Sequence, residues 1–395
     1  MKKISEGILY IGADDKDIDL FENQYKLEGG VSYNSYLIKG KKIAVADSVD
    51  ERRTQEWLAN LKEALGGEKP DYFIISHMES DHAGSIAAFC AEYPDAVLVG
   101  NAKTFPMLFQ FFPELKVDES RKLIVKEGDC LDLGEHKLTF FMAPLVHWPE
   151  VMVFYDSTGE VLFSADAFGT FDIPNPLTAS SHDQAAGWPD QARRYFINIV
   201  GKYGAQAQSL LKKAASLKIS VIAPLHGPVL TGDLSYYIGL YDTWSSYKSE
   251  AKGCVVAYST LHGNTEKAAL LAAENLRAAG EEVLVFDLSR CDVSEAVSQA
   301  FKYDKLLLAA VTYDGNLMPC MQDFLYHLKL KNYCNRTVAV IQNGSWGPAA
   351  ARQIQEQLNS MKNIKQVEPV VTIRSAMTEE NKNQIKEAVK AILAS

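Results

Sequence analysis

Paired cysteines are missing from this sequence. The six cysteines are scattered along the chain, and none of them forms a C-x-x-C pair. Their spacing therefore excludes a rubredoxin-like iron site and a zinc ribbon. Isolated cysteines are typical of reduced, mostly buried thiols in a reducing compartment. The six residues are Cys90, Cys130, Cys254, Cys291, Cys320 and Cys334.

Long apolar runs and an excess of positive charge are also missing. No stretch approaches the roughly 18 consecutive apolar residues of a membrane-spanning helix. The opening MKKISEGILYIG is too short in its apolar part for a signal peptide, and the charged run GADDKDID follows at once. The net charge of -10 argues against nucleic acid or an anionic membrane as a partner. We therefore expect a cytoplasmic protein with neither kind of partner.

Two domains are expected from the length of the chain and from the order of its predicted strands and helices. The 395 residues are 47% hydrophobic and 23% charged, the balance of an ordinary globular protein. In residues 1–251, strand-like runs such as ILYIG and KKIAVADSV mix with helical stretches, which predicts an αβ sandwich of two sheets. In residues 252–395, strands and helices alternate, which predicts a doubly wound parallel sheet of order 2-1-3-4-5.

The densest group of potential metal ligands is the run His77-x-Glu79-x-Asp81-His82, directly after the strand-like DYFIIS. Side chains alternate along an extended chain, so His77, Glu79 and Asp81 are expected on one side and His82 on the other. One short loop could in this way serve two metal ions.

Three later segments each end an apolar strand with a further potential ligand: His147, Asp166 and His226. A single histidine is more often structural, but the combined set favours a metal site. Its nitrogen and oxygen donors, without thiolate, suit iron, manganese or zinc, and a carboxylate such as Asp166 can bridge two cations. The other histidines lie in polar or helical contexts; they are His136, His182, His262 and His327.

The run HMESDH resembles the metallo-β-lactamase-fold signature H-x-H-x-D-H, with Glu79 in place of the second histidine. An anionic oxygen at this position suits redox-active iron better than hydrolytic zinc. Together with the flavodoxin-like second half, the blocks GGVSYNSYLI, APLVHWP, SADAFG and LHGPV resemble the flavodiiron proteins. The resemblance implies a metallo-β-lactamase-like αββα sandwich, followed by a flavodoxin-like five-stranded sheet.

The same resemblance implies two non-haem iron ions and assigns their ligands. His77, Glu79 and His147 would bind one iron. Asp81, His82 and His226 would bind the other, and Asp166 would bridge the two.

A flavin mononucleotide (FMN) site is expected at three loops of the second half. YSTLHGNTEK follows a strand and opens a helix, so its hydroxyls and backbone N–H groups can hold a phosphate. TYDGNLMP and NGSWGPAA follow later strands and would flank the flavin ring. The predicted phosphate-side contacts are Ser259, Thr260, Leu261, His262, Gly263, Asn264 and Thr265. The predicted ring-side contacts are Thr312, Tyr313, Asp314, Gly315, Asn316, Ser345, Trp346 and Gly347.

The resemblance also implies a reaction and partners. Electrons would pass through FMN to the irons and reduce dioxygen to water and/or nitric oxide to nitrous oxide, protecting an anaerobic or microaerobic cell. The donor would be external, such as rubredoxin or a flavin reductase. A head-to-tail homodimer, or a dimer of dimers, would bring Trp346 of one subunit near Glu79 of the other.

Two alternatives remain open at this point. One is a zinc-dependent hydrolase fused to a flavodoxin, and Glu79 argues against it. The other is a simple electron carrier, and the complete set of metal ligands argues against that. The preference between the two gases would depend on residues around the metals, namely Trp148, Glu150, Phe168 and Tyr195.

Overall fold

The computed structural model describes residues 2–181 and 187–395, and His182 lies outside this part. The chain divides into two compact units. The first comprises Met1–Phe196 and Tyr203–Asp242, and the second Ile197–Lys202 and Thr243–Ser395. The short segment of the second unit is anchored within it, since Asn198 donates a hydrogen bond to the carbonyl of Ser294 at 3.2 Å.

The first unit is a sandwich of two seven-stranded sheets. The first sheet runs in the order β1 (Lys2–Ser5), β2 (Ile8–Tyr10), β7 (Tyr36–Lys39), β8 (Ile43–Ala46), β9 (Tyr72–Ile74), β10 (Val97–Gly100) and β11 (Lys122–Ile124). The second runs β12 (Cys130–Asp132), β13 (Lys137–Met142), β14 (Met152–Asp156), β15 (Val161–Phe163), β17 (Val221–Ala223), β18 (Val229–Leu230) and β16 (Thr178–Ala179).

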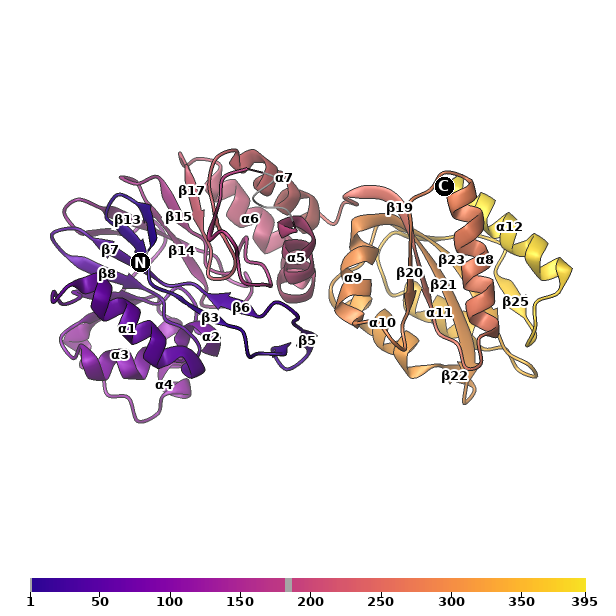
Figure 1. Ribbon diagram of the computed structural model, residues 1–395, viewed down its shortest axis with the longest axis horizontal. Coiled ribbons are helices and arrows are strands. Elements are labelled where there is room, and N and C mark those ends of the chain that lie inside the picture. The colour runs from indigo at the N-terminus through magenta and orange to yellow at the C-terminus, as the bar shows by residue number, and fades with distance from the viewer. Residues whose placement is uncertain (1, 182–186) are drawn as a thin grey trace. The chain divides into compact units, whose positions relative to one another are not determined.

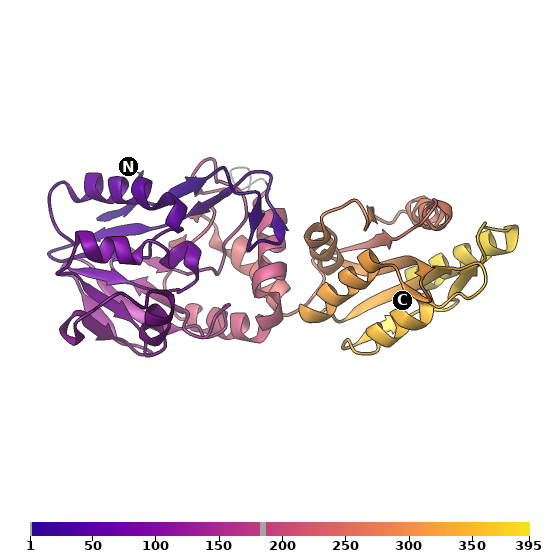
Figure 2. The same cartoon turned by 90° about the horizontal axis from the view of Figure 1, so that it is seen from below.

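The core of this unit lies between the two sheets. Apolar side chains of the first sheet, such as Ile38 and Ile74, share one cluster with Phe140 and Phe154 of the second. Helices cover the outer faces (Figure 1; Figure 2). On the first sheet they are α1 (Thr54–Leu65), α3 (Ile86–Glu92) and α4 (Thr104–Phe111). On the second they are α5 (Trp188–Tyr195), α6 (Gly204–Ala214) and α7 (Leu234–Ser245).

Helix α1 illustrates how the sequence determines these elements. Its buried residues Trp57, Leu61, Ala64 and Leu65 recur at helical spacing and form one apolar stripe. The helix ends at Gly66, whose φ of 61° places it in the left-handed region that glycine adopts without strain. A 3₁₀ turn at Glu51–Arg53 precedes the helix.

The second unit has one sheet in the order β20 (Val283–Asp287), β19 (Ala251–Tyr258), β21 (Tyr303–Tyr313), β23 (Arg336–Asn343) and β24 (Ile364–Gln366). The strand pairs along this order are parallel. The order 2-1-3-4-5 and the flavodoxin-like fold class are thus confirmed.

The fifth strand of this sheet is divided, because β25 (Val371–Ile373) continues the pairing with β23 after β24. Pro369 lies in the gap and has no N–H for the ladder. The helices of this unit are α8 (Asn264–Ala278), α9 (Val293–Lys302), α10 (Pro319–Leu330), α11 (Ala350–Leu358) and α12 (Glu379–Leu393). In the part of the chain that the structure describes, no helix combines the length and apolar character needed to cross a membrane.

Candidate metal centre and flavin cavity

The ligand-rich loop follows β9 and is held in place by a buried carboxylate. Asp47 accepts a hydrogen bond from the backbone N–H of Ser76 at 2.8 Å and one from its hydroxyl at 2.6 Å. The loop then carries His77 and Glu79 before it turns into the short helix α2 (Ser80–Ala83), which carries Asp81 and His82. The other three candidate ligands come from the second sheet: His147 after β13, Asp166 after β15 and His226 after β17.

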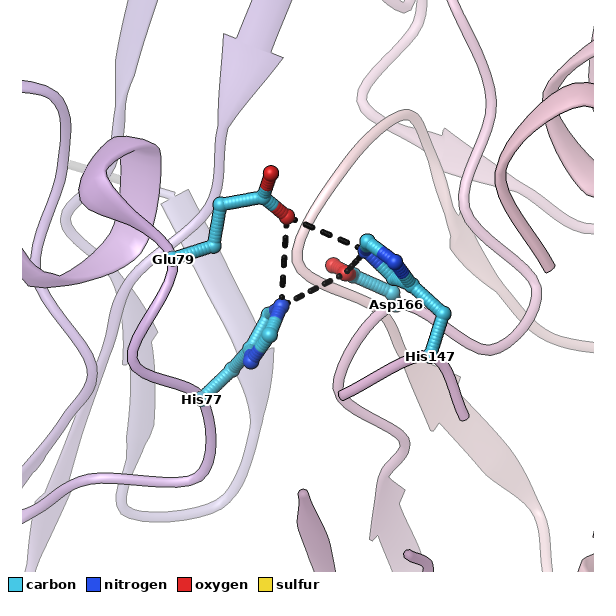
Figure 3. Close-up of side chains that lie close together, drawn as sticks. All are labelled: His77, Glu79, His147 and Asp166. Carbon is cyan, nitrogen blue, oxygen red and sulfur yellow. Dashed lines mark hydrogen bonds and ion pairs between the residues drawn. The ribbon is translucent and has the colours of Figure 1, made fainter. Parts of the chain in front are cut away.

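One group of side chains consists of His77, Glu79, His147 and Asp166, which point toward one another (Figure 3). Nε2 of His147 lies 3.0 Å from Oε2 of Glu79 and 3.2 Å from Oδ2 of Asp166. Nε2 of His77 lies 3.3 Å from each of the same two oxygens.

The second group consists of Asp81, His82 and His226. Nε2 of His226 lies 3.2 Å from Oδ2 of Asp81, and Nε2 of His82 lies 3.4 Å from that oxygen. The other oxygen of Asp166, Oδ1, lies 3.2 Å from His82 and 3.9 Å from His226. The Asp166 carboxylate therefore presents one oxygen to each group, which is the arrangement that a bridging ligand requires.

The expectation that Asp81 would lie on the same side as His77 and Glu79 is wrong. The extended chain ends at Glu79, and α2 begins at Ser80. A helical turn presents consecutive side chains about 100° apart instead of on opposite faces. Asp81 and His82 can therefore serve the same group.

The spacing and burial of these atoms suit metal ions. Metal–ligand bonds of about 2.1 Å place neighbouring ligand atoms about 3.0 to 3.4 Å apart in octahedral or tetrahedral coordination. Seven of the eight distances given above are in this range. Buried polar atoms without a hydrogen-bond partner include both oxygens of Asp81 and of Asp166, and Nε2 of His82, His147 and His226. Buried polar atoms are rarely left unpaired, and bound cations would satisfy this set.

Charge in the site is balanced between acidic and basic groups. Burial opposes a charge on His77, but the Asp166 and Glu150 carboxylates outweigh it and hold the pKa of His77 well above its usual value. Burial also opposes a charge on His147, but its hydrogen bonds to the Asp166 and Glu79 carboxylates outweigh burial and raise the pKa of His147 to about 9. Burial would raise the pKa of Asp166, but His77 and His82 hold it well below the usual range. A bound cation would take the place of the histidine protons.

A flavin-sized cavity of about 540 Å³ lies in the second unit, at the carboxyl ends of its strands. Twelve predicted contacts line it: Thr260, Leu261, His262, Asn264, Thr265, Thr312, Tyr313, Asp314, Gly315, Ser345, Trp346 and Gly347. Three predicted contacts are not among the lining residues. Ser259 is fully buried behind the loop, Gly263 caps α8, and Asn316 lines a neighbouring groove.

The comparisons with known proteins agree with these two sites. The family described as ODP family beta lactamase matches residues 31–227, and the flavodoxin family matches residues 256–388. The chain is 30% identical to the nitric oxide reductase of Moorella thermoacetica, over 94% of this chain and 92% of that protein. This chain belongs to the flavodiiron protein family.

Two solved structures have the same fold as this chain over its whole length. The structure of rubredoxin oxygen:oxidoreductase from Desulfovibrio gigas is 23% identical, with a TM-score of 0.92 over 100% of this chain and 98% of that one. The flavodiiron protein of Giardia intestinalis is 24% identical, with a TM-score of 0.90 over 100% of this chain and 97% of that one. The anaerobic nitric oxide reductase flavorubredoxin of Pectobacterium atrosepticum is 28% identical over 90% of this chain and 70% of that protein.

Hydrogen bonds behind the histidines orient them for metal binding in this flavodiiron protein. A carboxylate and a carbonyl only accept, so Nδ1 of His77 donates to Glu150 at 2.8 Å and Nδ1 of His226 donates to the carbonyl of Ser32 at 2.8 Å. Both imidazoles thereby present an unprotonated Nε2 to the site when they are neutral. Glu150 also accepts from the backbone N–H of Met78 at 2.9 Å.

The other residues expected around the metals differ in position. The Trp148 ring lies edge-on to His77, with centroids 5.3 Å apart, and Tyr195 lies 5.5 Å from His226. Phe168 instead stacks on Tyr241 at 4.3 Å.

Some residues of both sites were not predicted from the sequence. Asp47 directly follows β8, the strand that pairs with β9. Its position at the end of a strand was a signal that it could lie near the metal ligands. The flavin cavity is also lined by Val311, Asn343, Gly344 and Ser375. Ser375 follows β25, and its hydroxyl lies 2.7 Å from that of Ser345. The predicted flavin contacts lie in the loops after the first, third and fourth strands, whereas Ser375 lies in the loop after the fifth.

Proposed function

We propose that this flavodiiron protein is an oxidoreductase that takes electrons through FMN to a non-haem di-iron centre and reduces dioxygen to water and/or nitric oxide to nitrous oxide. The observation that carries the proposal is the Asp166 carboxylate, which offers one oxygen to each of two buried ligand groups. A single metal site would not need this arrangement. The match to the nitric oxide reductase over 92% of that relative supports the reaction class.

The ligands are assigned as follows. One iron would be held by His77, Glu79 and His147, the other by Asp81, His82 and His226, and Asp166 would be shared by the two groups. When bound, FMN and the iron pair would supply one-electron transfer to a diatomic gas. Three carboxylates would offset the charge of the cations, and the buried rings of Phe21 and Tyr195 pack beside His226.

A cavity of about 340 Å³ adjoins the metal centre and is suited to a small substrate. Glu79 and Asp81, one from each ligand group, line it together with Phe21 and Tyr33. Its volume of about 340 Å³ admits a diatomic gas and water.

The partners and domains are proposed on the same basis. The metal-binding domain is proposed as residues 1–251 and the FMN domain as 252–395. An external carrier such as rubredoxin or a flavin reductase supplies electrons in the cytoplasm. Subunits pair head to tail, as a dimer or a dimer of dimers, with Trp346 and Glu79 near the junction. The 93% exposure of Trp346 beside the flavin cavity supports this pairing. A stable, active monomer in sedimentation experiments would contradict it.

The substitution Asp166→Asn tests the metal assignment. It removes the negative charge between the groups, so we expect iron content to fall by at least half and gas reduction to fall by more than about 100-fold, with FMN retained. The exposed Asp95→Asn is the matched control and should leave all three quantities unchanged. Unchanged iron content and turnover in Asp166→Asn would overturn the assignment, and two zinc ions with hydrolytic activity would favour the hydrolase alternative.

A further inference from the structure

The flavin cavity is bordered by a fourth loop, which follows the fifth strand of the sheet. Ser375 lies two residues after β25 and lines the cavity together with Ser345 and Trp346 from the loop after β23. The predicted flavin contacts all come from the loops after the first, third and fourth strands. The loop after the fifth strand therefore adds a polar side chain to the ring side of the cavity that those three loops do not supply.

The backbone of Ser375 is held in an uncommon conformation. Its φ of 64° lies in the left-handed region that favours glycine and that other residues adopt at a cost. Asn343, which is only 4% exposed, clamps this backbone from both sides. The amide nitrogen of the Asn343 side chain donates to the Ser375 carbonyl at 2.9 Å, and its oxygen accepts from the Ser375 N–H at 3.0 Å. A costly conformation that is fixed by specific contacts points to a function at this position.

This conformation brings two hydroxyl groups together at the cavity. Oγ of Ser375 lies 2.7 Å from Oγ of Ser345. The N–H of Gly344 donates to the carbonyl of Ile373 at 3.1 Å, and Arg374 donates to the carbonyl of Ser345 at 3.4 Å, so the two loops are tied together on both sides of the pair. One hydroxyl proton is used between the two oxygens, while the other proton and the remaining lone pairs stay available. The pair can therefore both donate to a ligand and accept from it.

The isoalloxazine ring of a flavin has one edge that matches such a pair. This polar edge carries two carbonyl oxygens, which accept, and one N–H group, which donates, whereas the opposite edge is an apolar dimethylbenzene. A few well-placed polar groups fix the orientation of a ligand in a cavity. Ser345 and Trp346 are predicted ring-side contacts, so the hydroxyl pair lies on the side of the cavity where the ring is expected.

We propose that Ser375 is a flavin-binding residue contributed by a fourth loop, and that its hydroxyl, paired with that of Ser345, recognises the polar edge of the isoalloxazine ring. This inference rests on the proposed FMN site and adds a binding loop to it. Recognition of the ring has a distinct signature. Loss of the hydroxyl should weaken every ligand that contains the ring by the same factor, whether or not the ligand carries a ribityl chain or a phosphate.

The test measures the dissociation constants of FMN, riboflavin and lumiflavin, which has the ring without the ribityl chain, for the full chain stripped of flavin. Fluorescence quenching gives all three. Ser375→Ala should weaken the binding of each ligand about fivefold, the effect of one lost hydrogen bond. Ser375→Gly suits the left-handed backbone better but also lacks the hydroxyl, so it should weaken binding by about as much. Ser360→Ala is the control, since Ser360 is exposed and is not among the residues that line the cavity.

A double-mutant cycle tests whether the two hydroxyls act as a pair. Ser345→Ala should weaken binding by a factor similar to that of Ser375→Ala. The double variant should bind about as well as either single variant, because each substitution already disrupts the pair. Thermal unfolding of the flavin-free variants, compared with that of Ser360→Ala, checks that the flavin domain still folds.

The outcomes separate this inference from the proposed function. If Ser375→Gly binds all three flavins as tightly as the unmodified chain, the hydroxyl has no role in recognition, and the FMN site remains. If Ser375→Ala weakens FMN and riboflavin but leaves lumiflavin unchanged, the hydroxyl contacts the ribityl chain and the assignment to the ring edge is wrong. If the unmodified chain binds none of the three flavins, both the inference and the proposed function fail.

Discussion

At the scale of single residues, the metal centre depends on groups that do not touch the metal as much as on those that would. Glu150 is fully buried, and its carboxylate accepts from Nδ1 of His77 and from the backbone of Met78. The side-chain amide of Asn101 donates to the Glu150 carbonyl, which fixes the backbone at that point. These contacts determine which imidazole nitrogen of His77 carries the proton and the direction in which the other nitrogen points.

Glu150→Gln should therefore weaken metal binding without removing a ligand. The amide keeps the shape of the side chain but loses the charge that makes His77 a strong donor, so we expect iron affinity at the His77 group to fall about 10- to 100-fold. Competition with a chelator under anaerobic conditions measures this. The exposed Glu63→Gln is the control, and equal iron retention in both variants would contradict the role of Glu150.

Metal loading should also depend on pH in a direction set by His147. The pKa of His147 in the protein without metal is raised to about 9, so at lower pH this imidazole carries a proton that a metal ion must displace. Metal affinity should fall as the pH is lowered from 9 to 6.5, with release of protons on binding. Calorimetry of ferrous ion binding in buffers of different ionisation enthalpy measures that release, and binding without proton release would contradict the expectation.

The individual ligands could be predicted from the sequence, whereas their grouping could not be predicted from spacing alone. Each candidate ligand follows an apolar strand, and the ends of neighbouring strands meet at one edge of a sheet. The side on which Asp81 lies is set by the helical turn α2 that begins after Glu79. The alternation of side chains along an extended chain does not apply to a helical turn. Asp47 and Ser375 each come shortly after a strand, which was an available signal, but their contacts with Ser76 and Ser345 are long-range and could not be predicted from a local pattern.

At the scale of elements, the repeating strands and helices were predictable, and the irregular ends of elements were less so. The apolar runs identified the strands of the flavodoxin-like sheet and their order. The division of the fifth strand into β24 and β25 depends on Pro369 and on how each piece pairs with β23. The loop after β25 thereby reaches the flavin cavity through Ser375, which the sequence analysis missed.

The start of α12 connects this loop to the stability of the flavin domain. Oγ1 of Thr378 accepts from the backbone N–H of Asn381 at 3.2 Å, and the Asn381 side chain accepts in return from the Thr378 N–H at 3.2 Å. This capping box begins the helix three residues after Ser375, which lines the flavin cavity.

Thr378→Ala removes the capping hydrogen bond and should lower the free energy of unfolding by about 1 kcal/mol. Urea unfolding followed by flavin fluorescence measures the change. Glu387→Ala, at an exposed position in the middle of the same helix, should change stability by less than about 0.5 kcal/mol. Equal effects of the two substitutions would contradict the importance of the cap.

At the scale of the whole molecule, each unit supplies one part of a redox reaction. The first unit brings seven potential ligands from four segments into two adjoining groups. The second provides a cavity with hydroxyls, backbone N–H groups and a helix N-terminus at one end. The fold class of both units could be predicted because each follows a regular alternation of strands and helices. FMN and a di-iron centre are the cofactors of the family to which the chain belongs, and the individual metal ligands and flavin contacts stay predictions.

The most direct test of the account is a single-turnover measurement on one sample in which metal and flavin are also quantified. The full chain is purified anaerobically, its iron, zinc and FMN are determined, and the reduced protein is mixed with dioxygen or nitric oxide in a stopped-flow instrument. The account predicts two irons and one FMN per chain, and oxidation of the flavin by at least one gas that is lost in Asp166→Asn. A chain without paired iron, or flavin oxidation that proceeds equally in Asp166→Asn, would contradict it.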